Sequence, residues 1–295
     1  MDFRVLQYFL AITREQSISS AAKSLHLSQP TLSRQIKTLE EELGKQLFIR
    51  SNRTITLTEE GMLLRKRAEE ITQLVNKTKE EIILSNETIA GNISIGAGET
   101  GGIRHIAKVD KKLQSKYPLL YFHIVSGDKI TVLEELDKGL IDFALIFGEV
   151  DLSKYDYLTL PSIDKFSVMM RKDDILANLD VITPEDLLDK PLIVSRQIIS
   201  DSNLSQLFNC DEKLLNIVAT YNLLFNGSLM VDEGMGYALC FDKIINVTGN
   251  SNLCLRPLSI QIMPKMSLIW KKYQVFTKAS EKFLLTIQEN IENIF

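Results

Sequence analysis

The side chains best suited to chemistry lie between residues 29 and 43, where apolar and polar positions follow the period of a helix. The apolar positions have a four-three-four spacing, which predicts one buried helix face: Leu32, Ile36, Leu39 and Leu43. The opposite face carries hydrogen-bonding and cationic groups that suit base edges and phosphates in a major groove. We expect this face to comprise Gln29, Pro30, Thr31, Ser33, Arg34 and Lys37.

Two further helices must position this face. Residues 3–14 have helical spacing of apolar side chains, and residues 19–25 follow two serines that suit helix N-caps. Ser28 is the expected N-cap of the helix at 29–43, and Gly44 is its expected C-terminal stop. The pattern predicts a helix-turn-helix whose third helix carries the polar face.

Residues 47–57 predict a β-hairpin, because apolar and polar residues alternate around a Ser-Asn turn. Arg50 and Arg53 flank its tip. Taken alone, such a hairpin is better explained by a solvated charged turn. Beside the helix at 29–43 we interpret it as a wing that grips phosphate or minor groove.

A long helix is predicted over residues 58–86, beginning at the N-cap Thr58. Its apolar residues repeat as heptads, as in a helix that pairs with a second helix. The first 57 residues are too few to cover this stripe, so we expect a homodimer. The seam comprises Leu64, Ala68, Ile71, Val75, Thr78 and Ile82.

The composition of the 295 residues is that of a chain with two or three folded units. Residues 1–57 hold eight Lys/Arg and five Asp/Glu, while the rest of the chain is acidic, so the front is the part suited to a polyanion. There is no apolar run long enough for a membrane span and no secretory signal. Three scattered cysteines and three scattered histidines suggest neither disulfides nor a metal site. We therefore expect a cytoplasmic protein that does not bind membranes.

After residue 90, strands and helices alternate, which predicts parallel sheets with crossover helices. The expected strands are 91–95, 121–125, 142–147, 166–170, 192–194, 217–220, 237–241 and 266–270. The expected helices are 102–116, 129–139, one starting at 183, 223–233 and 277–293. No GxSxG, HExxH or Walker motif is present, so we expect no enzyme, no catalytic residue and no cofactor.

One motif supports an alternative. Residues 95–101, IGAGETG, match GxGxxG between a strand and a helix, and Asp128 ends the next strand. A winged-helix repressor with a dinucleotide-sensing Rossmann domain is therefore a second interpretation. Against it, the heptad helix separates the two parts of the chain, and short glycine motifs are frequent by chance.

The front of the chain resembles the N-terminal signature of LysR-type transcriptional regulators. The resemblance covers residues 3–61 and includes SISSAAKSLHLSQPTLSRQI, LEEELG, LFIR and LTEEG. It continues more weakly in DKGLIDFALIFG, ITPEDLLDKPLIV and VDEGMGYALC. It implies a bacterial regulator of transcription, often a homotetramer, that binds a dyad-symmetric operator in double-stranded DNA.

The resemblance also implies a fold class, namely a winged helix-turn-helix, a long linker helix, and a two-lobed α/β domain like periplasmic binding proteins of type 2. We expect the winged domain at 1–58, the dimerisation helix and hinge at 59–90, and the effector-binding domain at 91–295. Lobe I would comprise 91–161 and 267–295, and lobe II 162–266.

A small-molecule effector is expected where the carboxyl ends of the strands meet between the two lobes. Thr100 and Ser126 offer hydroxyl groups there, and Arg196 offers a grip for a carboxylate. Glu99 and Asp128 favour a ligand with amino or hydroxyl groups over a purely anionic one. The expected site comprises Gly98, Glu99, Thr100, Ser126, Gly127, Asp128, Phe147, Gly148, Ser195, Arg196 and Asn226 (or its neighbour Asn222).

Overall fold

The computed structural model describes residues 1–50, 55–83, 89–161, 164–200, 203–260 and 265–292. The chain divides into two compact units, Met1–Ile83 and Leu84–Phe295. Each unit has its own hydrophobic core, so each is described by itself. No helix within the described ranges is both long and apolar enough to cross a membrane.

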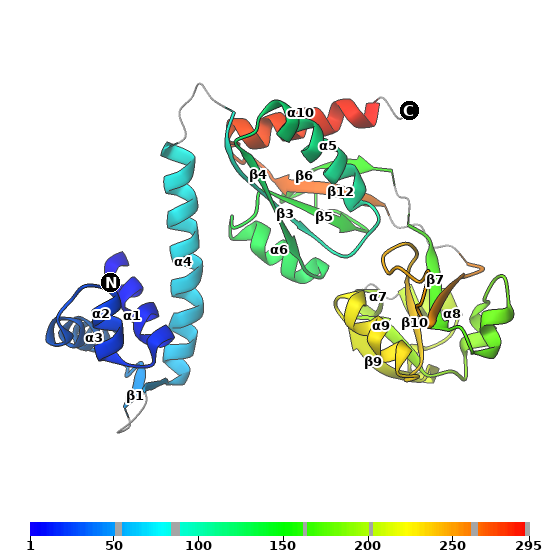
Figure 1. Ribbon diagram of the computed structural model, residues 1–295, viewed down its shortest axis with the longest axis horizontal. Helices are drawn as coiled ribbons and strands as arrows, with labels where there is room; N and C mark the ends of the chain where they lie inside the picture. The colour runs from blue at the N-terminus through cyan, green and yellow to red at the C-terminus, as the bar shows by residue number, and fades with distance from the viewer. Residues whose placement is uncertain (51–54, 84–88, 162–163, 201–202, 261–264, 293–295) are drawn as a thin grey trace. The chain divides into compact units, whose positions relative to one another are not determined.

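The first unit is a three-helix domain with a small hairpin and one long helix (Figure 1). Ser17 and Ser28 cap the second and third helices with their side chains, and Gly44 ends the third in a left-handed conformation. The elements are α1 (Phe3–Glu15), α2 (Ile18–Ser24), α3 (Gln29–Leu43), β1 (Phe48–Arg50), β2 (Ile55–Leu57) and α4 (Glu59–Ile83).

The core of this unit joins α1, α3 and the start of the hairpin. Phe9, Leu32 and Ile36 are fully buried, and the Phe9 ring lies 5.1 Å from that of Phe48. Leu39 is buried as well, but Leu43 is 41% exposed. The prediction of a buried stripe over 32–43 is therefore wrong at its last position.

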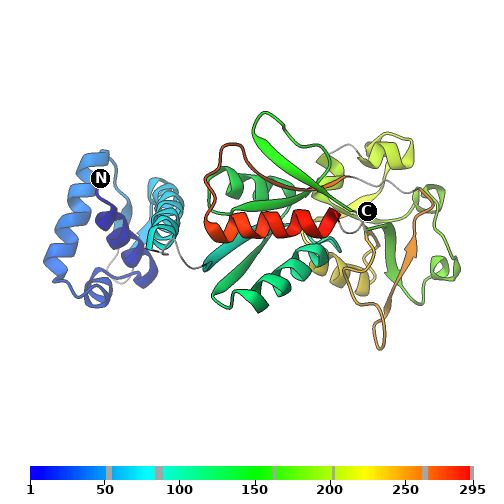
Figure 2. The same ribbon diagram turned by 90° about the horizontal axis from the view of Figure 1, so that it is seen from above.

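The first lobe of the second unit is a five-stranded sheet in the order β4-β3-β5-β12-β6. Helices α5 (Ile103–Lys116) and α10 (Lys278–Glu292) pack on one face, and α6 (Lys129–Asp137) packs on the other (Figure 2). The strands are β3 (Gly91–Ala97), β4 (Leu120–Ser126), β5 (Phe143–Phe147), β6 (Tyr155–Leu160) and β12 (Met266–Lys271).

The second lobe is another five-stranded sheet, in the order β11-β7-β10-β8-β9. Helix α9 (Leu224–Asp232) covers one face, while α7 (Arg196–Ser200) and α8 (Asn203–Phe208) cover the other. The strands are β7 (Phe166–Arg171), β8 (Leu192–Ser195), β9 (Ile217–Tyr221), β10 (Tyr237–Phe241) and β11 (Leu253–Pro257). The chain thus passes from the first sheet to the second between β6 and β7, and returns between β11 and β12.

Both sheets are mixed, which corrects the prediction of parallel sheets. Strands β4, β3 and β5 are parallel, as are β9, β8 and β10, but β12 and β7 pair antiparallel with both of their neighbours. The antiparallel strands include β6 and β11, which were not predicted. The helix predicted from residue 183 is a single 3-10 turn, Pro184–Leu187.

Candidate nucleic-acid interface and effector cleft

The polar face of α3 is open to solvent. Gln29, Pro30, Thr31, Arg34 and Lys37 are exposed and Ser33 is half-buried, while Leu32, Ile36 and Leu39 on the other side are buried. The three-helix core therefore holds the helix by its apolar stripe and leaves the N-terminal half of the polar face free for a partner. A helix that reads DNA presents the same half of its surface to the major groove.

Local contacts pre-arrange this face. The Ser28 hydroxyl accepts the Thr31 N–H at 3.3 Å and exchanges a hydrogen bond with the Thr31 hydroxyl at 2.7 Å. Lys37 lies 3.5 Å from Glu41 one turn later, and both side chains are largely exposed. Such a pair contributes only about 0.3–0.5 kcal/mol, so a phosphate can readily replace Glu41 as the partner of Lys37.

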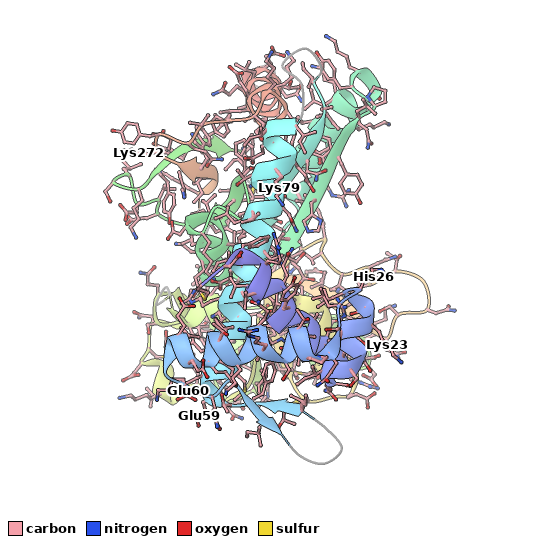
Figure 3. The ribbon with its side chains drawn as sticks, turned by 90° about the vertical axis from the view of Figure 1, so that its left-hand side faces the viewer. Lys23, His26, Glu59, Glu60, Lys79 and Lys272 are labelled. Atoms are coloured by element: carbon pink, nitrogen blue, oxygen red, sulfur yellow. The ribbon has the colours of Figure 1, made fainter. Side chains whose placement is uncertain are left out.

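Charge is unevenly distributed along α3. Lys23 and His26 lie near its N-terminal end, whereas Glu59 and Glu60 lie near its C-terminal end (Figure 3). Lys45 contacts Glu60 at 3.1 Å, which partly neutralises the acidic end. A polyanion is therefore attracted to the N-terminal end of the helix.

The hairpin is tied to α3 through one carboxylate. Glu40 accepts the backbone N–H groups of Leu47 at 2.8 Å and Phe48 at 3.3 Å, just where β1 begins. Strands β1 and β2 then pair antiparallel, with Phe48 opposite Leu57 and Arg50 opposite Ile55. The tip of the hairpin, with Arg53, lies outside the described residues, so phosphate contacts by Arg50 and Arg53 stay a prediction.

A cavity of about 570 Å³ lies between the two lobes of the second unit. Of the residues expected there, seven line it: Gly98, Glu99, Gly127, Asp128, Phe147, Gly148 and Ser195. Asn222 lines it in place of Asn226. Thr100, Ser126 and Arg196 are not among the lining residues, although their neighbours in the chain are. The lining residues not expected from the sequence include Lys129, Glu149, Phe166, Gln197, Ile198, Tyr221, Leu224, Leu239, Cys240, Phe241 and Ile244.

The Thr100 side chain is bonded within the protein, to the segment that connects the two lobes. Its hydroxyl donates to Asp164 Oδ2 at 2.6 Å and accepts the Gly102 N–H at 2.9 Å, and the side chain is 5% exposed. The Gly101 N–H donates to Asp164 Oδ1 at 2.7 Å. Asp164, in the segment that joins the two lobes, is 3% exposed. The residues just before α5 are therefore fastened to that connecting segment.

The same contacts count against the dinucleotide interpretation. The Asp164 carboxylate occupies the start of α5, where a dinucleotide-binding fold places the pyrophosphate. Packing alone accounts for a glycine at position 96, because a Cβ there would lie 2.6 Å from side-chain atoms of Ile141 and of Val132. The GxGxxG pattern thus marks close packing at a hinge.

Arg196 spans the cleft and binds a carboxylate of the protein itself. Its Nη2 lies 2.5 Å from Asp128 Oδ2, while Asp128 Oδ1 caps α6 by accepting the Thr131 N–H and hydroxyl. Burial opposes ionisation of Asp128, but the hydrogen bonds from Thr131 and the Arg196 charge together lower its pKa. The Asp128 carboxylate therefore has protein partners at both oxygens, whereas the Arg196 side chain remains 57% exposed.

A second polar contact also joins the lobes. The Glu99 carboxylate, at the end of β3, accepts the backbone N–H of Leu224, the first residue of α9. Leu223 occupies the N-cap of α9 and has no side-chain group that could do so. Helix α9 is thus capped from the opposite lobe.

Three aromatic rings form an apolar wall, which we call the ring cluster: Phe147, Phe166 and Phe241. Phe241 lies 4.9 Å from Phe147 of the first lobe and 4.8 Å from Phe166 of its own lobe. The nearby Tyr221 turns its hydroxyl to the Leu239 carbonyl at 2.6 Å. Burial raises the pKa of the Cys240 thiol, so this side chain stays uncharged in the cavity. Among the described residues, no group of His, Cys, Asp and Glu side chains could hold a metal ion.

Comparison with known proteins decides the family. Residues 3–62 match the bacterial regulatory helix-turn-helix protein, lysR family, and residues 86–292 match the LysR substrate binding domain. The chain belongs to the LysR family. As a LysR-type protein it is a DNA-binding transcription regulator with a substrate-binding domain.

Relatives of this LysR regulator share its whole length or most of it. It is 35% identical to the HTH-type transcriptional regulator BsdA of Bacillus subtilis over 71% of this chain and 72% of that one. It is 28% identical to a probable RuBisCO transcriptional regulator of Phaeodactylum tricornutum over 98% of this chain and 97% of that one. The structure of CbnR, a LysR family transcriptional regulator, has the same fold, with a TM-score of 0.75 at 16% identity over 99% of both chains. Full-length CbnR complexed with its target DNA gives a TM-score of 0.73 at 16% identity, covering 98% of this chain and 99% of that one.

Proposed function

We propose that this regulator binds a dyad-symmetric operator in double-stranded DNA as a homodimer or homotetramer, and that a small molecule in the cleft controls it. It works in the cytoplasm and carries out no enzymatic reaction. The exposed polar face of α3 carries this proposal, because its N-terminal half presents groups suited to base edges opposite a buried stripe. That full-length CbnR has been solved with its target DNA supports the proposal.

The DNA contacts are divided between bases and backbone. Gln29 suits adenine, Arg34 suits guanine, and Thr31 can meet a thymine methyl group. Lys37 and the wing arginines suit phosphates, which position the protein without reading sequence. We expect Arg34→Ala to weaken specific binding by about 1–3 kcal/mol.

The test begins with selection of an operator from random DNA by the full-length protein. Affinity for the selected site and for a scrambled one is then measured for the wild type and for Arg34→Ala with Lys37→Ala. Lys66→Ala, on the exposed side of α4, is the control for loss of a positive charge. If the double variant binds the selected site like the wild type, α3 is not the recognition helix.

Pairing through α4 accounts for a row of apolar side chains that its own unit leaves uncovered. Only Gly61 and Ala68 of this helix are buried. Leu63, Leu74 and Ile82 are 60%, 42% and 77% exposed, and Ile71 is 37% exposed. A second copy of α4 would cover this face and place two α3 helices on one dyad.

Charges placed in the seam test the pairing. Ile71→Asp with Val75→Asp should yield monomers in light scattering and weaken operator binding. Lys66→Asp with Gln73→Asp adds the same two carboxylates on the other side of the helix and should leave the dimer intact. A monomeric wild type would contradict the proposal.

Control by a small molecule is tested by filling the cavity. Leu239→Trp places extra bulk in the cleft, and we expect it to abolish the metabolite response of a reporter while operator affinity stays unchanged. Val181→Trp, at an exposed site of the second lobe, is the control. Mapping the bound sites in the genome supplies the regulated genes, whose substrates and products are the molecules to try. A full response of Leu239→Trp would place the effector elsewhere.

A further inference from the structure

We propose that the cleft takes an apolar molecule whose polar end is cationic or uncharged, and that Glu99 makes it reject carboxylates. This inference rests on the effector cleft proposed above and specifies its ligand. It follows from the apolar wall, the charges along the cavity, and the one backbone donor that Glu99 already occupies.

The body of the ligand meets aromatic and aliphatic carbon. The ring cluster closes one side of the cavity, with centroid distances of 4.8 and 4.9 Å within it. Ile198, Leu239 and Ile244 add aliphatic surface. The hydroxyl of Tyr221 is used by the Leu239 carbonyl, so Tyr221 also offers only its ring. These faces suit an apolar ligand, and aromatic faces attract a cation as well.

The charges along the cavity favour a cation. The described lining residues include the carboxylates of Glu99, Asp128 and Glu149 and one ammonium group, that of Lys129. Asp128 is already paired with Arg196, so these two opposite charges cancel in the net charge around the cavity. The remaining acidic groups, Glu99 and Glu149, outnumber Lys129, whose Nζ lies near Gly148 at the edge of the cavity.

Glu99 also occupies the place where a ligand carboxylate would bind best. The exposed N–H groups in the first turn of a helix attract anions. In α9 the first of these, from Leu224, is bound by the Glu99 carboxylate, and the N-cap residue adds no side-chain hydrogen bond. An anionic ligand that binds the Leu224 N–H would have to displace Glu99, and one that binds the next N–H groups of the turn would lie beside its charge.

The test compares two probes with the same ring and opposite charge, phenethylamine and phenylacetate. Dissociation constants are measured on the full-length protein by methyl NMR, and shifts of the Ile198 and Ile244 methyl groups place the probe in the cavity. Glu99→Gln removes the charge and keeps the shape. Glu149→Gln removes a charge from the same cavity without touching α9, and is the matched control.

We expect the wild type to bind phenethylamine at least about tenfold more tightly than phenylacetate, as one nearby charge can produce. Glu99→Gln should reduce that ratio about tenfold, and Glu149→Gln less than about threefold. A wild type that prefers phenylacetate, or a ratio unchanged in Glu99→Gln, overturns the selectivity but leaves the effector cleft standing. If neither probe shifts the two methyl groups in any of the three proteins, the cleft and the selectivity both fail.

Discussion

Removal of the Asp164 carboxylate should unfold the first lobe at much lower urea concentration. Asp164→Ala deletes the acceptor of the Thr100 hydroxyl and of the Gly101 N–H, at 2.6 and 2.7 Å. Asp164 and Thr100 are 3% and 5% exposed, so water does not replace the lost acceptor. A hydrogen bond to a charged group contributes about 1.5–3 kcal/mol, which gives a loss of about 3–6 kcal/mol for the two.

The single tryptophan reports on this lobe. Trp270 lies on β12, with its ring edge-on to Phe143 at 6.2 Å, so its fluorescence follows unfolding of the first sheet in the intact protein. With a urea dependence of about 2 kcal/mol per molar, the midpoint should fall by about 1.5–3 M.

The control is Asp180→Ala, which removes an exposed aspartate from the second lobe and should leave the midpoint unchanged. Operator affinity at zero urea checks that the first unit is intact in both variants. A midpoint for Asp164→Ala within about 0.3 M of the wild type would correspond to less than about 1 kcal/mol and would refute the reasoning.

Three other predictions concern single side chains. Gly61→Ala drives a Cβ into the Leu47 carbonyl oxygen, so it should destabilise the first unit by about 1–3 kcal/mol and weaken operator binding without changing the urea midpoint of Trp270. Glu40→Ala frees two backbone N–H groups, so hydrogen exchange at Leu47 and Phe48 should accelerate while α1 keeps its protection. Burial raises the pKa of Asp110 to about 7, above its unfolded value, so the folded state loses stability as the pH rises from 4 towards 7. Asp110→Asn should therefore raise the urea midpoint at pH 8 and change it little at pH 4; an equal change at both values would contradict the assignment.

The helices of the first unit could be predicted from the sequence because the patterns that mark them, an apolar period and capping residues, lie within a few residues of one another. The stripe of α3 and its caps at Ser28 and Gly44 can be read from the period of a helix. Leu43 was misplaced because its exposure depends on where the neighbouring elements end, which periodicity does not contain. The spacing of residues in the sequence does not indicate that Glu40 binds the start of the hairpin, because this contact depends on the fold.

For the cleft too, some lining residues could be predicted from the sequence and others could not. The rule that ligand sites follow the carboxyl ends of parallel strands located Gly98, Asp128 and Ser195. It failed at Thr100, because the partner that occupies this hydroxyl is 64 residues further along the chain. Of the ring cluster, only Phe147 was expected; Phe166 and Phe241 were missed because strand periodicity shows that two faces exist without showing which face borders the cavity.

The position of β12 has a consequence for how the protein is made. β12 lies between β5 and β6, and the ring of Phe283 in α10 packs 5.1 Å from Phe143. The neighbouring strands β5 and β6 are synthesised more than a hundred residues before β12, so the first sheet cannot be completed until β12 is available. The second sheet, by contrast, is built from the continuous stretch between Phe166 and Pro257. We therefore expect the second lobe to fold before the first lobe, which can close only once β12 and α10 have been made. A nascent chain that has emerged from the ribosome as far as about residue 260 would carry a finished second lobe and an unfinished first one, with unpaired strand edges exposed.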